Sequence, residues 1–303
     1  MSGAARLVLR KNQDRRVRAG HPWVFSNEVA EIEGSPADGD LVEVADFRGA
    51  FLGRAYYNRK SLICARLLTR GRDEIDAGFF ARRIERAARF RDAVLPGERA
   101  LRLVYGEADQ LPGLVVDRYD EVLAVQILTL GIEARAALVR EALEHTLRPR
   151  AAVRLADSPL RALEGLPLGR EVWWGEVAGP LEVAIEGFTV EVDLLHGQKT
   201  GLFLDQRLNR RVAEARAAGR RVLDLFCYQG EWALHAARGG AREVVAVDSS
   251  EPALAAARRR VTRSARRLRS RLRRAAASAG SDESTATTSR APPRAAGSAH
   301  SPW

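Results

Sequence analysis

A strand–loop–helix–strand pattern over residues 222–248 constrains the fold of this 303-residue chain more than any other feature. Two short apolar runs, at 222–226 and 244–248, are typical of strands and enclose a helix over 232–238. A crossover helix makes the two strands parallel neighbours in one sheet. The sequence therefore predicts an α/β domain, in which ligands bind beyond the carboxyl ends of the strands.

The loop after the first of these strands is a candidate cofactor site. Asp248, at the end of the second strand, can accept hydrogen bonds from both ribose hydroxyls of a nucleoside cofactor, and Gly230 permits close backbone approach. The spacing between Asp224 and Asp248 suits that geometry. The residues alone are equally compatible with an ordinary strand-to-helix turn carrying a solvated aspartate.

The preceding chain shows two other patterns. Alternating segments at 41–45, 51–57 and 62–68, with a turn cluster at 34–40, predict a small barrel-like β domain. From residue 77 the apolar period becomes helical, and further strands and a helix over 133–147 predict a compact α+β module. The sequence predicts four parts: residues 1–74 (small β-barrel), 75–180 (central α+β domain), 181–257 (part of a Rossmann-like α/β domain) and 258–303 (disordered tail).

The basic charge of the chain is confined to its last segment. The formal net charge is +10, and residues 258–303 account for all of it, so the body is neutral. This segment is rich in Arg, Ala, Ser, Thr and Pro, a composition that cannot bury enough surface to fold, apart from an Arg-rich helix at its start. Its ten arginines between 258 and 274 leave open a second interpretation, an arm that binds RNA non-specifically.

Other features narrow the class of protein. Two cysteines, Cys64 and Cys227, exclude a disulfide framework and suit no zinc site. The N-terminus has no apolar signal segment, and no apolar run is long enough to span a bilayer. We therefore expect a cytoplasmic protein with no metal and no membrane partner.

Several longer motifs resemble one known family. They are GHPWVF at 20–25, GEADQLPGLVVDRY at 106–119, GQKTGLFLDQR at 197–207, VLDLFCY at 222–228 and VDSS at 247–250. In this order they resemble the bacterial large-subunit ribosomal RNA cytosine-C5 methyltransferases over about residues 6–257. The resemblance implies an N-terminal PUA domain, a central α/β domain and a class I methyltransferase domain, with S-adenosylmethionine as cofactor and ribosomal RNA as partner.

The resemblance also implies site residues. Asp224, Phe226 and Gly230 would line the methionine and ribose side of the cofactor pocket, and Asp248 would take the ribose hydroxyls with Ser249 beside it. A further motif near the cofactor contains Asp205, Gln206 and Arg207. Two positions depart from the family pattern, Gln229 where Thr is usual and Glu231 where Gly is usual. Glu231 suits a helix start but adds an acid near the bound carboxylate, so we expect weakened cofactor binding.

A basic cluster near the N-terminus is the candidate RNA contact. It consists of Arg10, Lys11, Arg15, Arg16, Arg18 and His21. Phosphate contacts need such a cluster, although a solvated basic face would look the same. Trp23 and Phe25 are predicted to be core residues rather than stacking platforms.

The reaction of the family that this sequence resembles requires residues that can be looked for in the chain. Its methyl transfer uses a cysteine thiolate that adds to cytosine C6, usually beside an Asp-Pro-Pro loop. The sequence contains no Asp-Pro-Pro, and neither Cys64 nor Cys227 lies at the expected position, so no catalytic residue is assigned. We therefore expect a catalytically incomplete, truncated or frameshifted family member that binds RNA. The alternative is a non-catalytic RNA-binding protein that uses the β domain and the basic tail.

Overall fold

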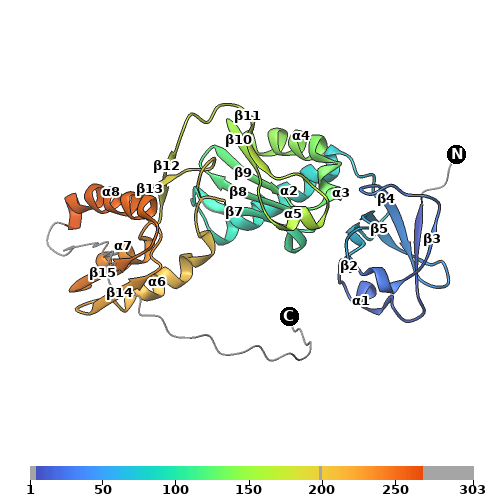
Figure 1. The fold of residues 1–303 in the computed structure, drawn as a ribbon, viewed down its shortest axis with the longest axis horizontal. Coiled ribbons are helices and arrows are strands. Elements are labelled where there is room, and N and C mark those ends of the chain that lie inside the picture. The colour runs from blue at the N-terminus through green and yellow to red at the C-terminus, as the bar shows by residue number, and fades with distance from the viewer. Residues whose placement is uncertain (1–4, 198–199, 269–303) are drawn as a thin grey trace, which may run out of the picture.

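The N-terminal part of the computed structural model is a six-stranded sheet (Figure 1). The structure describes residues 5–197 and 200–268, with side chains as far as Arg260. The elements are β1 (Arg6–Leu9), α1 (Arg15–Arg18), β2 (Trp23–Val24), η1 (Ser26–Glu28), β3 (Val29–Glu33), β4 (Leu41–Ala45), β5 (Phe51–Tyr57) and β6 (Ala65–Thr69). The sheet order is β2-β6-β5-β4-β1-β3, with β1 and β4 parallel. The predicted N-terminal β domain is confirmed, and two of its strands have the predicted bounds.

The central part is a five-stranded sheet in the order β11-β10-β9-β8-β7. Its elements are α2 (Ala77–Val94), β7 (Ala100–Tyr105), η2 (Gly106–Asp109), β8 (Leu114–Tyr119), β9 (Val122–Ile127), α3 (Leu130–Glu133), α4 (Ala136–Leu147), β10 (Ala151–Ala156), α5 (Leu160–Leu163) and β11 (Gly169–Trp174). Helix α2 begins where the Asp76 carboxylate accepts a 2.7 Å hydrogen bond from the Phe79 amide. The predicted helix over 133–147 is divided into α3 and α4.

Tyr56 joins these two sheets. It lies on β5 of the first sheet, yet its side chain is buried in the hydrophobic core of the second. Its hydroxyl donates to the Thr129 Oγ1 at 3.0 Å or to the Pro112 carbonyl at 3.1 Å. Its ring packs against Gly131, where an added Cβ would lie 1.9 Å from the ring Cγ. The sheets are therefore fastened by a contact that requires glycine at 131.

The C-terminal part holds a hairpin and the predicted strand–helix–strand unit. Its elements are β12 (Leu181–Ile185), β13 (Phe188–Val192), η3 (Leu204–Gln206), α6 (Arg207–Ala215), β14 (Arg221–Leu225), α7 (Glu231–Arg238), β15 (Glu243–Val247) and α8 (Glu251–Leu268). Strands β14 and β15 are parallel, with Leu225 opposite Val247. Helix α8 packs against β13 and α7, so the hairpin lies beside this unit (Figure 1). The predicted mixed α/β class is confirmed.

Two predicted boundaries differ from the structure. The strand expected over 222–226 ends at Leu225, because Phe226 turns into the left-handed region with φ of 59° and exposes its side chain. Helix α8 passes through residue 258, the predicted start of the tail, and ends at Leu268. Residues 269–303 of that tail lie outside the described residues. Within the described ranges, no helix has the length and apolar character needed to cross a membrane.

The Tyr56 contact gives a stability prediction. We expect Gly131→Ala to lower the free energy of unfolding by about 1–3 kcal/mol or more, because the new methyl group overlaps the Tyr56 ring. Urea unfolding followed by circular dichroism measures the change. Gly169→Ala is the matched control, because nothing lies within 4 Å of an added Cβ there. Equal destabilisation by the two substitutions would contradict the proposed role of this contact.

Candidate cofactor and nucleic-acid sites

The loop between β14 and α7 has a tightly turned backbone. Phe226 and Tyr228 have positive φ angles of 59° and 49°, and Gly230 has one of 78°. The Cys227 amide donates to the Val247 carbonyl at 3.0 Å, which holds the loop against the end of β15. Strained backbone of this kind gathers at ligand sites. The loop lies at the carboxyl edge of the parallel pair, where the sequence predicts the cofactor.

Two aspartates hold the shape of this loop. Asp248 accepts hydrogen bonds from the Tyr228 amide at 2.7 Å and the Ser250 amide at 2.8 Å. Asp224 accepts a hydrogen bond from the Ala233 amide in the first turn of α7, at 3.1 Å. The structure therefore brings Asp224 and Asp248 to the same loop, beside Gly230. Ser249 follows at the surface.

The electrostatics of this loop favour a cationic ligand. Burial, together with the negative charges of Glu231 and Asp248, raises the pKa of Asp224 to about 6. A positive group beside Asp224 would relieve both effects, because it favours the ionised carboxylate. The donor set thus fits a ligand with a cationic end and ribose hydroxyls.

Arg260 neutralises Glu231 through an ion pair that the sequence did not predict. Its buried guanidinium forms a 2.8 Å ion pair with Glu231 and donates to the Gln229 carbonyl at 3.2 Å. The pair joins α8 to α7 across 29 residues, so no local spacing indicates it. The expected repulsion between Glu231 and a ligand carboxylate is therefore offset within the protein.

The motif at 205–207 lies next to the loop, but its residues have two different environments. The ring of Phe203, just before the motif, contacts the Tyr228 ring edge-on at 5.7 Å. Asp205 lines a cavity of about 500 Å³ against the central sheet and accepts a hydrogen bond from the Gln206 amide group. Arg207 is buried and donates to the Ala100 carbonyl at 2.6 Å, so it fastens α6 to β7.

Both cysteines are buried free thiols. Burial raises the pKa of Cys64 to about 11, and burial with the charges of Asp224 and Asp248 raises that of Cys227 to about 11. Each thiol therefore stays protonated at neutral pH, consistent with packing roles.

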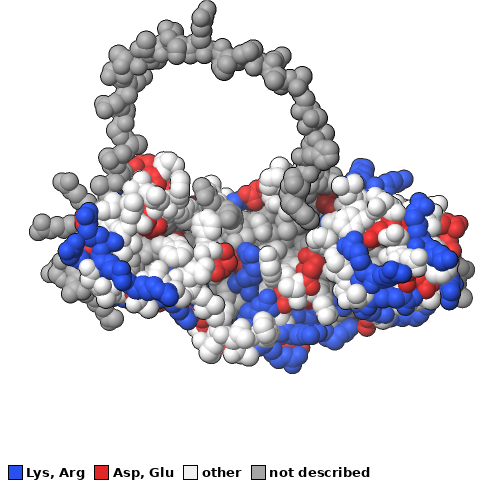
Figure 2. Space-filling view, turned by 90° about the horizontal axis from the view of Figure 1, so that it is seen from below, with Lys and Arg blue, Asp and Glu red and all other residues white. Residues whose placement is uncertain are grey.

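The predicted RNA-contact cluster lies on α1 and the loops on either side of it, in the N-terminal part. Figure 2 shows Lys and Arg side chains among scattered acids at the right of the molecule, the end that holds the N-terminal part. All members of the cluster but His21 are exposed. Arg16 pairs with Glu28 at 3.1 Å, and Arg18 pairs with Asp14 and with Asp46. Arg10 donates to the Asn27 carbonyl at 3.2 Å. The side chains of Lys11 and Arg15 have no hydrogen-bond or ion-pair partner among the described residues, so they are the most available for phosphate.

Comparisons with known proteins define the class. Residues 7–70 match the model of a PUA-like domain, and residues 126–272 match that of an S-adenosylmethionine-dependent methyltransferase. The chain therefore has one segment similar to PUA-like domains and a second segment similar to S-adenosylmethionine-dependent methyltransferases. The methyltransferase match begins within β9, well before the predicted boundary at 181.

Comparison with individual proteins gives a more specific likeness than the family models do. The chain is 37% identical over 260 residues to proteins named ribosomal RNA large subunit methyltransferase I from Yersinia pseudotuberculosis (serotype O:1b, strain IP 31758) and from Yersinia pestis (bv. Antiqua, strain Angola). The alignment covers 84% of this chain and 66% of each relative. The chain thus spans slightly less than two thirds of their length.

Solved structures agree on the fold. A candidate methyltransferase from Streptococcus mutans superposes with a TM-score of 0.72 at 20% identity, over 85% of this chain and 66% of that one. Another candidate methyltransferase structure, in complex with SAH, superposes with a TM-score of 0.73 over the same shares. At this identity the likeness concerns the fold alone.

The raised pKa of Asp224 predicts a pH-dependent stability. Its folded pKa lies above the unfolded value, so the ionised carboxylate costs folding free energy above about pH 6, and this cost disappears as the pH falls toward 4. We expect Asp224→Asn to be more stable than the unsubstituted chain by about 1–2 kcal/mol at pH 8. The difference should shrink toward pH 4. Urea unfolding at a series of pH values measures it, and a difference independent of pH would contradict the assignment.

Proposed function

We propose that this chain binds S-adenosylmethionine at the β14–α7 loop and large-subunit ribosomal RNA through its PUA-like domain, as a cytosine-C5 methyltransferase family member acting in the cytoplasm. The observation that carries the proposal is the gathering of Asp224, Gly230 and Asp248 around the strained β14–α7 loop at the edge of the parallel pair. The similarity to ribosomal RNA large subunit methyltransferase I supports the substrate.

Different residues around the loop would contact different parts of the cofactor. The outer lone pairs of Asp248 would accept hydrogen bonds from the ribose hydroxyls, because its inner ones hold the amides of Tyr228 and Ser250. Asp224 would face the cationic methionine end, and Gly230 would allow backbone approach. When bound, the cofactor supplies an electrophilic methyl group.

The cysteines of the chain argue against complete catalysis. Addition to cytosine C6 requires a thiolate, and both thiols are buried with a pKa of about 11. We therefore propose that this chain holds cofactor and RNA without transferring the methyl group.

The second candidate function is RNA binding by the basic tail. The contacts of the arginines at the start of the tail argue against RNA binding by those residues. Arg258 pairs with Glu251, Arg259 with Glu191 and Arg260 with Glu231. These three arginines are engaged within the protein, so an arm of this kind would begin beyond α8.

The cofactor proposal is tested at Asp248. We expect Asp248→Asn to weaken S-adenosylmethionine binding about tenfold or more, because charge-assisted hydrogen bonds to the ribose are lost. Isothermal titration calorimetry measures the affinity. Glu243→Gln, which removes an acid at the opposite end of β15, is the matched control. Failure of the unsubstituted chain to bind, or equal affinities for the two variants, would overturn the proposal.

The RNA proposal is tested at Lys11 and Arg15. We expect the double substitution Lys11→Gln, Arg15→Gln to weaken binding to a fragment of large-subunit ribosomal RNA and to reduce the slope of log K against log salt by about 1.4, since each single-strand phosphate contact contributes about 0.7. Fluorescence anisotropy at several salt concentrations measures both. Arg18→Gln should have a smaller effect, because Arg18 is already paired with two acids. An effect of Arg18→Gln as large as that of the double substitution would contradict this assignment.

A further inference from the structure

A second cavity lies where the N-terminal sheet meets the central sheet. Its volume is about 700 Å³, within the range of small-ligand sites. Two of the motifs that carry the family resemblance meet here, because the Trp23 Nε1 donates to a Glu107 carboxylate oxygen at 2.7 Å. Neither motif has a role in the cofactor loop.

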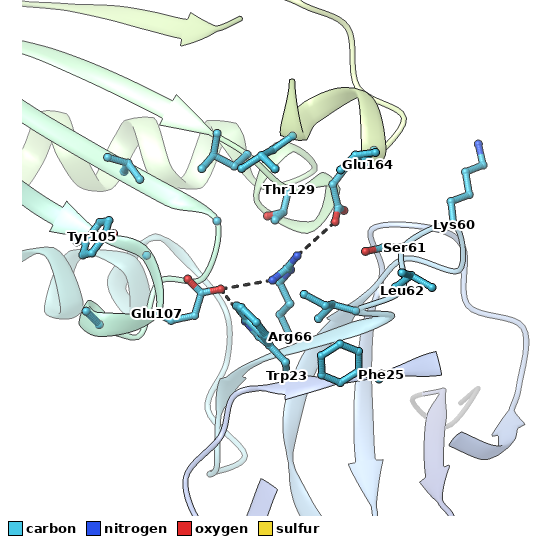
Figure 3. Close-up of a pocket in the computed structure, with 18 residues that line it drawn as sticks. Trp23, Phe25, Lys60, Ser61, Leu62, Arg66, Tyr105, Glu107, Thr129 and Glu164 are labelled. Atoms are coloured by element: carbon cyan, nitrogen blue, oxygen red, sulfur yellow. Dashed lines mark hydrogen bonds and ion pairs between the residues drawn. The ribbon is translucent and has the colours of Figure 1, made fainter. Parts of the chain in front are cut away.

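The walls of the cavity are aromatic and apolar. Figure 3 shows Trp23 and Phe25 on the side of the N-terminal sheet and Tyr105 on the side of the central sheet. The Trp23 and Phe25 rings meet edge-on at 6.4 Å, and Tyr105 is 56% exposed. Trp23 and Phe25 are half-buried, so the prediction that they are core residues is wrong. Aromatic faces of this kind stack on unpaired nucleobases.

A polar group is fixed inside these walls. Arg66 lies between two carboxylates, 3.4 Å from Glu107 and 3.6 Å from Glu164 (Figure 3). The Glu164 oxygens also accept from Asn58 at 2.7 Å, so this carboxylate is held in place. The second oxygen of Glu107 has no hydrogen-bond partner among the described residues. It can therefore accept from a ring or exocyclic N–H of a base.

The cavity is continuous with the basic cluster. The Arg16 guanidinium lies 4.9 Å from the centre of the Phe25 ring, and the His21 ring meets Trp23 edge-on at 5.4 Å. Lys60, in the loop after β5, also lines the cavity, and its ammonium has no ion-pair partner among the described residues. Cations thus flank the mouth, where the phosphates on either side of an inserted base would lie.

We propose that this cavity receives an unstacked base of single-stranded RNA, with the base between Tyr105 and the Trp23–Phe25 pair. The inference rests on the proposed RNA-binding function. It assigns base contact to the junction of the two sheets and phosphate contact to the flanking cations. Flipped bases in other RNA-binding sites are held by the same combination of stacking and hydrogen bonds.

The test compares two ligands that share a backbone. Fluorescence anisotropy of the full chain is measured with a fluorescein-labelled oligoadenylate of ten residues and with an abasic ribose-phosphate strand of the same length. We expect oligoadenylate to bind about 5- to 150-fold more tightly, the range for stacking of one base on aromatic side chains.

Two substitutions test whether the preference for oligoadenylate over the abasic strand arises in the cavity. Tyr105→Ala and Phe25→Leu should each reduce the affinity ratio of the two strands toward one and leave the affinity for the abasic strand unchanged. The control Phe90→Ala removes an exposed aromatic ring of α2 outside the cavity and should leave the ratio intact. Circular dichroism confirms that each variant is folded.

The outcomes separate the two proposals. Equal binding of both strands by the unsubstituted chain overturns the base site alone, because RNA binding then depends on the backbone. A base preference that survives both cavity substitutions also overturns it. Binding of neither strand overturns the RNA-binding function on which the base site rests.

Discussion

The contact of Tyr56 with Gly131 is the constraint on which the arrangement of the molecule depends. A tyrosine of the N-terminal sheet completes the core of the central sheet, and its hydroxyl is bonded within that core. The two sheets therefore pack as one unit rather than as domains on a linker. The cavity lined by Trp23 and Tyr105 lies at the same junction of the two sheets.

Local sequence patterns predicted much of the fold. The apolar segments over 41–45 and 51–57, with the turn cluster at 34–40 before them, located β4 and β5, although both strands are buried at most positions rather than on alternate ones. The apolar runs around Asp224 and Asp248 located the parallel pair and the loop at its carboxyl edge. These elements are specified by residues close together in the chain, which is why a single sequence is sufficient to find them.

Features that depend on distant residues were not predicted. The pair of Glu231 with Arg260 removes a repulsion that the loop sequence suggested. Trp23 was expected in a core, but its hydrogen-bond partner Glu107 lies 84 residues further along the chain, in η2 of the central part. Arg18, one of the predicted phosphate ligands, is already bound by two acids. In each case the sequence shows the residue type but not the neighbour that decides its role.

The environment of Asp224 couples ligand binding at the loop to the release of a proton. With a pKa of about 6, this carboxylate is partly protonated in mildly acidic solution. A cationic ligand that favours the ionised form must release that proton to the solvent. The heat of ligand binding near pH 6 therefore includes the ionisation enthalpy of the buffer, and the same titration in phosphate and in imidazole, whose ionisation enthalpies differ, reports how many protons leave the site.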